Sequence, residues 1–113
     1  MNYNPYYNPS ALGLIMMEFD EPDMIYSYNT LLFFATEDGR VFTAQDSGCS
    51  CPCPFELYEA STQAEAVRQM ERIESGDHAA SILTVWNRGY DGKRLLPDNP
   101  ERELREWVKE HIR

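Results

Sequence analysis

Apolar and aromatic residues dominate two segments on either side of a short polar turn, and this pattern predicts a β-hairpin. The first segment covers residues 26–36 and the second covers 40–44. Between them, Glu37-Asp38-Gly39 carries the Asp-Gly pair that favours a tight turn between two strands. Apolar residues occupy both alternating faces of the first segment, so neither face is suited to water. We therefore expect this strand to lie in the centre of a sheet.

A shorter apolar run precedes the hairpin and predicts another strand. Residues 12–19 are too few and too interrupted by glycine for a helix, and the chain is expected to leave the sheet from Glu18 onward. The opening Asn-Pro and Tyr residues at 4–9 are typical of a turn. The sheet is thus expected to contain about three strands within residues 12–46, around the central hairpin at 26–44.

The second half of the chain shows helical spacing. Thr62 and Glu65 form a capping-box pattern for a helix over 63–74, with Gly76 as its expected end. A helix over 79–86 is expected next, although the same residues alternate well enough to leave a strand open.

The last helix has the strongest pattern in the chain. Asn99 and Pro100 suit its N-cap and first turn, and apolar residues recur along one face to residue 112. His111 lies on that face and is interpreted as a half-buried packing residue, whereas His78 is expected to be solvated.

These elements predict a small α+β fold in one domain over 1–113. Its parts are a β-rich acidic part at 1–46, a Cys/Pro loop at 47–60 and a helical part at 61–113. One face of the sheet is expected to pack against the helices at 63–75 and 99–112, because amphipathic helices and a doubly apolar strand must bury each other.

All the cysteines of the chain, Cys49, Cys51 and Cys53, fall within five residues. Alternation in an extended chain would let them bind zinc together, but Pro52 and Pro54 favour polyproline II geometry, which turns Cys51 away from Cys53. A fourth ligand would have to come from Asp46, His78 or His111, none of which has zinc-motif spacing. We expect no metal and no cofactor, with a structural zinc site as the alternative.

The residues around the cysteines predict how the chain leaves the sheet. Asp46-Ser47-Gly48 is typical of a turn that ends a strand, and Pro54 suits the start of a short helical turn through Tyr58. Phe55 is expected to anchor the segment in the core.

Charge is distributed unevenly. The chain of 113 residues has a net charge of −9, and residues 1–67 contain ten acids but one base, Arg40. The negative electrostatic field of these acids is expected to repel nucleic acid. An acidic composition is also common in proteins where it only increases solubility. With no signal peptide pattern and no apolar run long enough for a membrane span, the protein is expected to be cytosolic.

The Tyr-Ser-Tyr-Asn-Thr-Leu run at 26–31 and the Gly-Cys-Ser-Cys-Pro segment at 48–52 resemble a family of small uncharacterised proteins encoded by bacteriophages of actinobacteria. The resemblance covers residues 1–58. It implies a phage origin and action in the cytoplasm of a bacterial host, and it implies no activity, cofactor or catalytic residue.

No catalytic constellation is evident, so an enzyme is not expected. The first hypothesis is a non-enzymatic module that binds a host or phage protein, with no direct contact to nucleic acid or membrane. The alternatives are an acidic nucleic-acid mimic that inhibits a DNA-binding or defence enzyme, a small zinc protein, and a minor virion component. Oligomeric state is open. The candidate contact residues are Glu37, Asp38, Asp46, Glu56, Tyr58 and Glu59.

Overall fold

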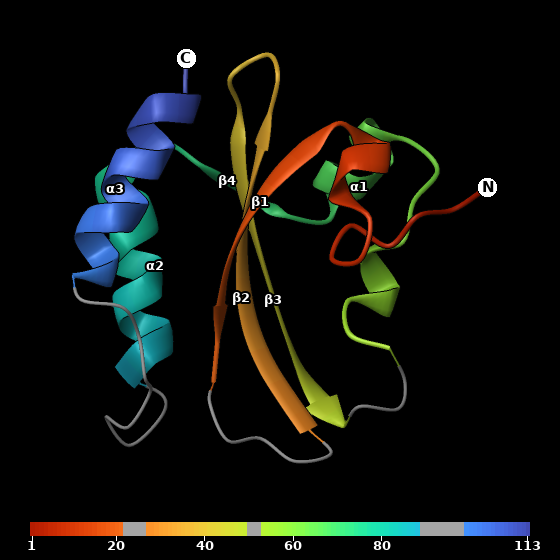
Figure 1. Ribbon diagram of the computed structural model, residues 1–113, viewed down its shortest axis with the longest axis horizontal. Coiled ribbons are helices and arrows are strands. Elements are labelled where there is room, and N and C mark those ends of the chain that lie inside the picture. The colour runs from red at the N-terminus through yellow and green to blue at the C-terminus, as the bar shows by residue number, and fades with distance from the viewer. Residues whose placement is uncertain (22–26, 50–52, 89–98) are drawn as a thin grey trace.

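A computed structural model describes residues 1–21, 27–49, 53–88 and 99–113, and it shows an α+β fold (Figure 1). The predicted fold class is therefore confirmed. The strands are β1 (Leu14–Asp20), β2 (Ser27–Thr36), β3 (Val41–Cys49) and β4 (Glu71–Ile73). The helices are α1 (Gln63–Arg68), α2 (Gly76–Arg88) and α3 (Pro100–His111), with 3-10 turns η1 (Pro9–Leu12) and η2 (Glu56–Tyr58).

The four strands form one antiparallel sheet in the order β1-β2-β3-β4. As predicted, β2 is central, and it pairs along its length with β1 and β3. Its turn is the predicted Asp-Gly hairpin, in which Gly39 takes φ +89° and its N–H donates to the Thr36 carbonyl at 3.2 Å. A glycine suits this position because a side chain disfavours a left-handed backbone.

Both faces of β2 are buried, so the sheet separates two apolar cores. The helix-side core lies under α2 and α3, where Phe33 of β2 is fully buried. The N-terminal core lies on the opposite face, where Phe34 is fully buried beneath α1, the N-terminal segment and residues 53–60. Figure 1 shows α2 and α3 on one side of the sheet and α1 on the other. The expectation that helices 63–75 and 99–112 share one face is therefore wrong.

The helix predicted over 63–74 is also wrong in its second half. It ends at Arg68, and Glu71–Ile73 forms β4 beside β3. The apolar stripe read as one helix face divides between the two cores, since Val67 packs in the N-terminal core and Ile73 in the helix-side core. Pairing with β3 buries Ile73 to 1% exposure, which outweighs the local helical spacing. This strand raises the sheet from three strands to four.

Two strand ends were predicted too early. Glu18 does not leave the sheet, because it pairs with Leu32 within β1 and β2. Asp46-Ser47-Gly48 does not form a turn, because β3 continues through it to Cys49, with Tyr28 opposite Gly48. The Cys/Pro loop predicted over 47–60 is therefore part strand and part η2, with 50–52 outside the described residues.

The helices α2 and α3 pack against each other over the helix-side core. The prediction of helix over 79–86 is confirmed, as is the last helix. Gly76 begins α2 rather than ending the preceding helix, and a Cβ there would lie 3.2 Å from the Arg105 Cα of α3. Trp107 and His111 of α3 are half-buried and pack together, with ring centroids 4.6 Å apart and ring planes tilted by 38°, so the packing interpretation of His111 holds. Within the described residues, none of the helices is long and apolar enough to cross a membrane.

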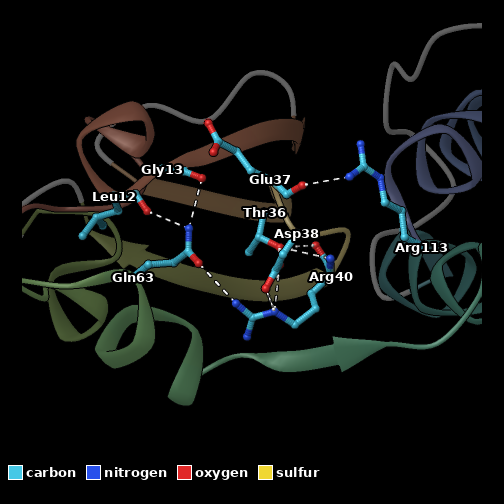
Figure 2. A network of polar contacts seen from close by, with 8 residues as sticks. All are labelled: Leu12, Gly13, Thr36, Glu37, Asp38, Arg40, Gln63 and Arg113. Atoms are coloured by element: carbon cyan, nitrogen blue, oxygen red, sulfur yellow. Dashed lines mark hydrogen bonds and ion pairs between the residues drawn. The ribbon is translucent and has the colours of Figure 1, made fainter.

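A polar network fastens the hairpin turn from two sides (Figure 2). On one side, the Gln63 side chain of α1 donates to the Leu12 and Gly13 carbonyls at 3.0 and 3.1 Å and accepts from Arg40 at 3.2 Å. On the other side, the Arg113 backbone N–H donates to the Gly39 carbonyl at 2.8 Å. The network joins segments that are distant in sequence at the end of the sheet where the hairpin turns.

We expect Gln63→Ala to lower the free energy of unfolding by about 1–2 kcal/mol, because three hydrogen bonds of one side chain are lost together. The control is Gln69→Ala, at an exposed position whose side chain has no hydrogen bond among the described residues. Urea unfolding measures both variants. Equal midpoints would show that the network does not stabilise the fold.

Candidate functional site

The face of the sheet that bears the N-terminal core changes from apolar to polar along its length. Near the hairpin turn, the residues on this face are apolar and covered, as at Leu32 and Phe34. Because side chains alternate along a strand, the same face continues at the other end of the sheet with polar residues. These are Glu18 and Asp20 of β1, Tyr28 and Thr30 of β2, and Asp46 of β3.

Each carboxylate in this polar half accepts a hydrogen bond from a neighbouring hydroxyl. The Tyr6 hydroxyl donates to Glu18 Oε2 at 2.8 Å, and the Thr30 hydroxyl donates to Asp20 Oδ1 at 2.7 Å. The Tyr28 hydroxyl donates to Asp46 Oδ2 at 2.8 Å. Each hydroxyl thus fixes the orientation of one acidic side chain.

Phe55 anchors the segment after the cysteines in the N-terminal core, as the sequence predicted, and it does so beside this polar half. Its ring is fully buried, its backbone takes φ +60°, and its N–H donates to Asp46 Oδ2 at 2.7 Å. The rings of Tyr6 and Tyr58 pack on it, with centroid distances of 5.3 and 5.6 Å. A non-glycine residue with positive φ is uncommon, and here the buried ring and the bond to Asp46 hold it in place.

We call this region the acid-tyrosine surface. It is built by the N-terminal segment, three strands and the η2 segment. Its members are Tyr6, Glu18, Asp20, Tyr28, Asp46 and Tyr58.

The acids and phenols of this surface shift each other's pKa. Burial raises the pKa of Glu18 to about 7, and its close contact with Asp20 adds to the rise. Burial and the hydrogen bond to Asp46 raise the pKa of Tyr28 to about 12. Burial and the Asp46 charge raise the pKa of Tyr58 as well. The tyrosines therefore remain neutral hydrogen-bond donors at neutral pH.

The shift at Glu18 predicts a pH dependence of stability. Its carboxyl binds a proton more tightly in the folded chain, with a pKa of about 7 against 4.5, so this contribution to stability is present at low pH and is lost as pH rises through that window. Glu18→Gln should lose less stability than wild type between about pH 5 and about pH 8, because the amide does not titrate. Urea midpoints at the two pH values test this, with Glu110→Gln on α3 as the control. If the midpoint changes between the two pH values by the same amount in wild type and in Glu18→Gln, the pH dependence comes from other titrating groups.

The structure places the six predicted contact residues at opposite ends of the sheet. Asp46 and Tyr58 belong to the acid-tyrosine surface. Glu56 lies beside it, lining a cavity of about 270 Å³ together with Tyr28 and Asp46, and Glu59 is exposed at the end of η2.

Glu37 and Asp38 lie in the hairpin turn, away from this surface. Asp38 accepts hydrogen bonds from Thr36 and from Arg40 Nε, and the Arg40 contact above all holds the pKa of Asp38 below its usual value. The Asp38 carboxylate thus makes its hydrogen bonds within the hairpin turn.

The cysteines lie at the border of the acid-tyrosine surface. Cys49, at the end of β3, and Cys53 are exposed, carry free thiols and line the 270 Å³ cavity. Cys51 lies outside the described residues. In the part of the chain that is described, no group of three or more His, Cys, Asp or Glu side chains is placed to hold a metal ion.

Four members of the surface, Tyr6, Glu18, Asp20 and Tyr28, were not predicted as contact residues. The register of β1 on β2 brings Glu18 and Asp20 to the same face as Tyr28. The alternation of residues 14–20 indicated that Glu18 and Asp20 share a face of the strand. The prediction that the chain leaves the sheet at Glu18 excluded both residues from that face.

A profile of the family described as Domain of unknown function (DUF7574) matches residues 3–88, which is most of the chain. The chain belongs to the DUF7574 family. The family region runs through β1, the hairpin, α1, β4 and α2, so it extends beyond the predicted resemblance over 1–58 and includes every member of the acid-tyrosine surface. It ends before α3. Searches of curated proteins and of solved structures find no match to the chain.

Proposed function

We propose that this DUF7574 protein is a non-enzymatic binding module whose acid-tyrosine surface contacts a basic segment of a partner protein. One observation carries the proposal: three carboxylates and three tyrosines converge from separate segments on one half of a sheet face. Residues 1–67 supply one base, Arg40, and it is paired with Asp38 at the opposite end of the sheet.

The chemistry of these side chains suits protein binding. Tyrosine is enriched in interfaces because its ring offers apolar area and its hydroxyl a hydrogen bond at a small entropy cost. Carboxylates attract basic partners and speed their association. No residue in this account acts on a substrate.

The distribution of the acids supports a protein partner over the alternative of a nucleic-acid mimic. A mimic needs carboxylates spaced like phosphates along one face. Glu18 and Asp20 meet that requirement locally, since alternate residues of a strand lie about 6–7 Å apart. Asp46 also lies on this face, but other described acids lie away from it: Glu37 and Asp38 are in the hairpin turn, and Glu65 is in the first turn of α1.

The sequence resemblance to proteins of actinobacterial phages supports a proposal about where this protein acts. We propose a small phage accessory protein that acts in the cytoplasm of the bacterial host, where its partner is a host or phage protein. Neither membrane nor nucleic acid is a partner in this proposal.

Co-purification from lysate of an actinobacterial host tests the function. The bait proteins are wild type, Glu18→Lys/Glu56→Lys on or beside the acid-tyrosine surface, and Glu103→Lys/Glu110→Lys on α3 as a control with the same change in net charge. Wild type and control should retain one partner, and the surface variant should lose it. A partner retained equally by all three, or absent from all three, would overturn the proposed function.

A further inference from the structure

We propose that the free edge of β1 accepts an extended segment of the partner as a fifth, antiparallel strand, with basic residues facing Glu18 and Asp20. This inference rests on the proposed function and specifies the conformation and chemistry of the bound segment.

The register shows which backbone groups of β1 point away from the sheet. The Glu21 N–H donates to the Asn29 carbonyl at 3.0 Å, one position beyond the β1-β2 pairing of Asp20 with Thr30. In an antiparallel pair, residues that bond to the neighbouring strand alternate with residues whose N–H and C=O point outward. The outward set is therefore Leu14, Met16, Glu18 and Asp20.

Among the described residues, no strand pairs with the outer edge of β1. β1 pairs over seven residues with β2, and no hydrogen bond joins its outward groups to another described segment. In Figure 1, β1 crosses in front of β2 and β3, with the helices to either side of the sheet. The edge at β4 is only three residues long, and such short edge strands are one way in which proteins discourage strand addition. An uncovered strand edge is a template for a peptide that adds to the sheet.

The side chains of β1 define what kind of strand fits. On one face, Glu18 and Asp20 contribute the carboxylates of the acid-tyrosine surface. On the other face, Ile15 is 50% exposed and Met17 is half-buried, which leaves apolar area near the edge. A strand added here should alternate basic and apolar residues. A second copy of this chain would instead bring Glu18 and Asp20 near the same acids, and like charges across strands are destabilising.

Antiparallel addition makes a specific prediction about the backbone of the incoming strand. Residues opposite Glu18 and Asp20 share their face of the sheet and exchange hydrogen bonds with them. The N–H groups of the basic residues therefore bond to β1, whereas those of the apolar residues point to solvent.

A fluorescently labelled peptide of alternating lysine and valine, seven residues long, is the probe, and fluorescence anisotropy measures its binding to the full chain. Two isomeric probes carry N-methyl groups either on the internal lysines or on the internal valines. Methylated lysines should weaken binding at least about tenfold because they cannot donate to β1, whereas methylated valines should leave it within about twofold.

The outcomes separate this inference from the proposed function. If both methylated peptides bind equally well and Glu18→Lys abolishes binding, the acidic surface binds basic segments but the β1 edge does not receive a strand. If methylation of the valines weakens binding and methylation of the lysines does not, antiparallel addition is wrong. If no peptide binds, both proposals fail. Sedimentation that shows a dimer of the protein alone, dissociated by the peptide, would assign the edge to a second copy and overturn the inference.

Discussion

The Leu104→Asp variant is expected to be unfolded in buffer without denaturant. Leu104 lies on α3 and is fully buried among apolar side chains of the helix-side core, so an introduced carboxylate would be removed from water. An unpaired buried charge costs several kcal/mol or more, and a domain of this size is stabilised by only about 5–15 kcal/mol. Circular dichroism should show loss of the helical signal, and heating should show no cooperative transition.

Leu104→Met is the matched control, because it keeps the volume and apolar character of the side chain and should cost less than about 1.5 kcal/mol. The pair also tests the role of α3, which lies outside the DUF7574 region yet contributes Leu104 and Val108 to the core. A folded Leu104→Asp variant with a transition like that of wild type would show that α3 is not an integral part of the domain.

Phe55→Ala is expected to lower the free energy of unfolding by about 3–5 kcal/mol. The ring is fully buried and supports Tyr6 and Tyr58, so its removal leaves a cavity and frees both tyrosines. The variant should also lose affinity for basic peptides under conditions where it remains folded, because the acid-tyrosine surface loses its support.

The control for Phe55→Ala is Cys53→Ser, two residues away at an exposed position, which should change stability by less than about 0.5 kcal/mol. Urea unfolding ranks the two variants. A larger loss in Cys53→Ser would show that the thiol, through a metal or a buried contact, holds this segment rather than the phenylalanine.

The sequence predicted those elements whose local pattern agrees with their tertiary contacts. The hairpin turn was predictable because the turn requires a positive φ, which Gly39 adopts readily. The helix α3 was predictable because apolar residues recur regularly along one of its faces. β2 was recognised as central because both of its faces are apolar.

The remaining errors come from contacts that are distant in sequence. The segment at 71–73 has helical spacing, but pairing with Val41–Thr43 of β3 makes it a strand. The extension of β3 to Cys49 follows from its pairing with the start of β2 and from the bond between Tyr28 and Asp46, neither of which a local turn pattern reveals.

The acid-tyrosine surface was only half predictable for the same reason. Asp46 and Tyr58 were named from an acidic segment near the cysteines, but Glu18 and Tyr6 meet only because the N-terminal segment folds back over β1. Charge composition indicated that acids matter, and the strand register decides which of them act together.

Mapping the binding of the lysine-valine peptide by NMR, through the amide shifts of the isotope-labelled full chain, tests the central claim most directly. We expect the largest shift changes at Tyr6, Glu18, Asp20, Tyr28 and Asp46, weakening with added salt, with α2 and α3 nearly unchanged. Changes centred on α2 and α3, or no saturable change at all, would contradict the assignment of the acid-tyrosine surface as the binding site.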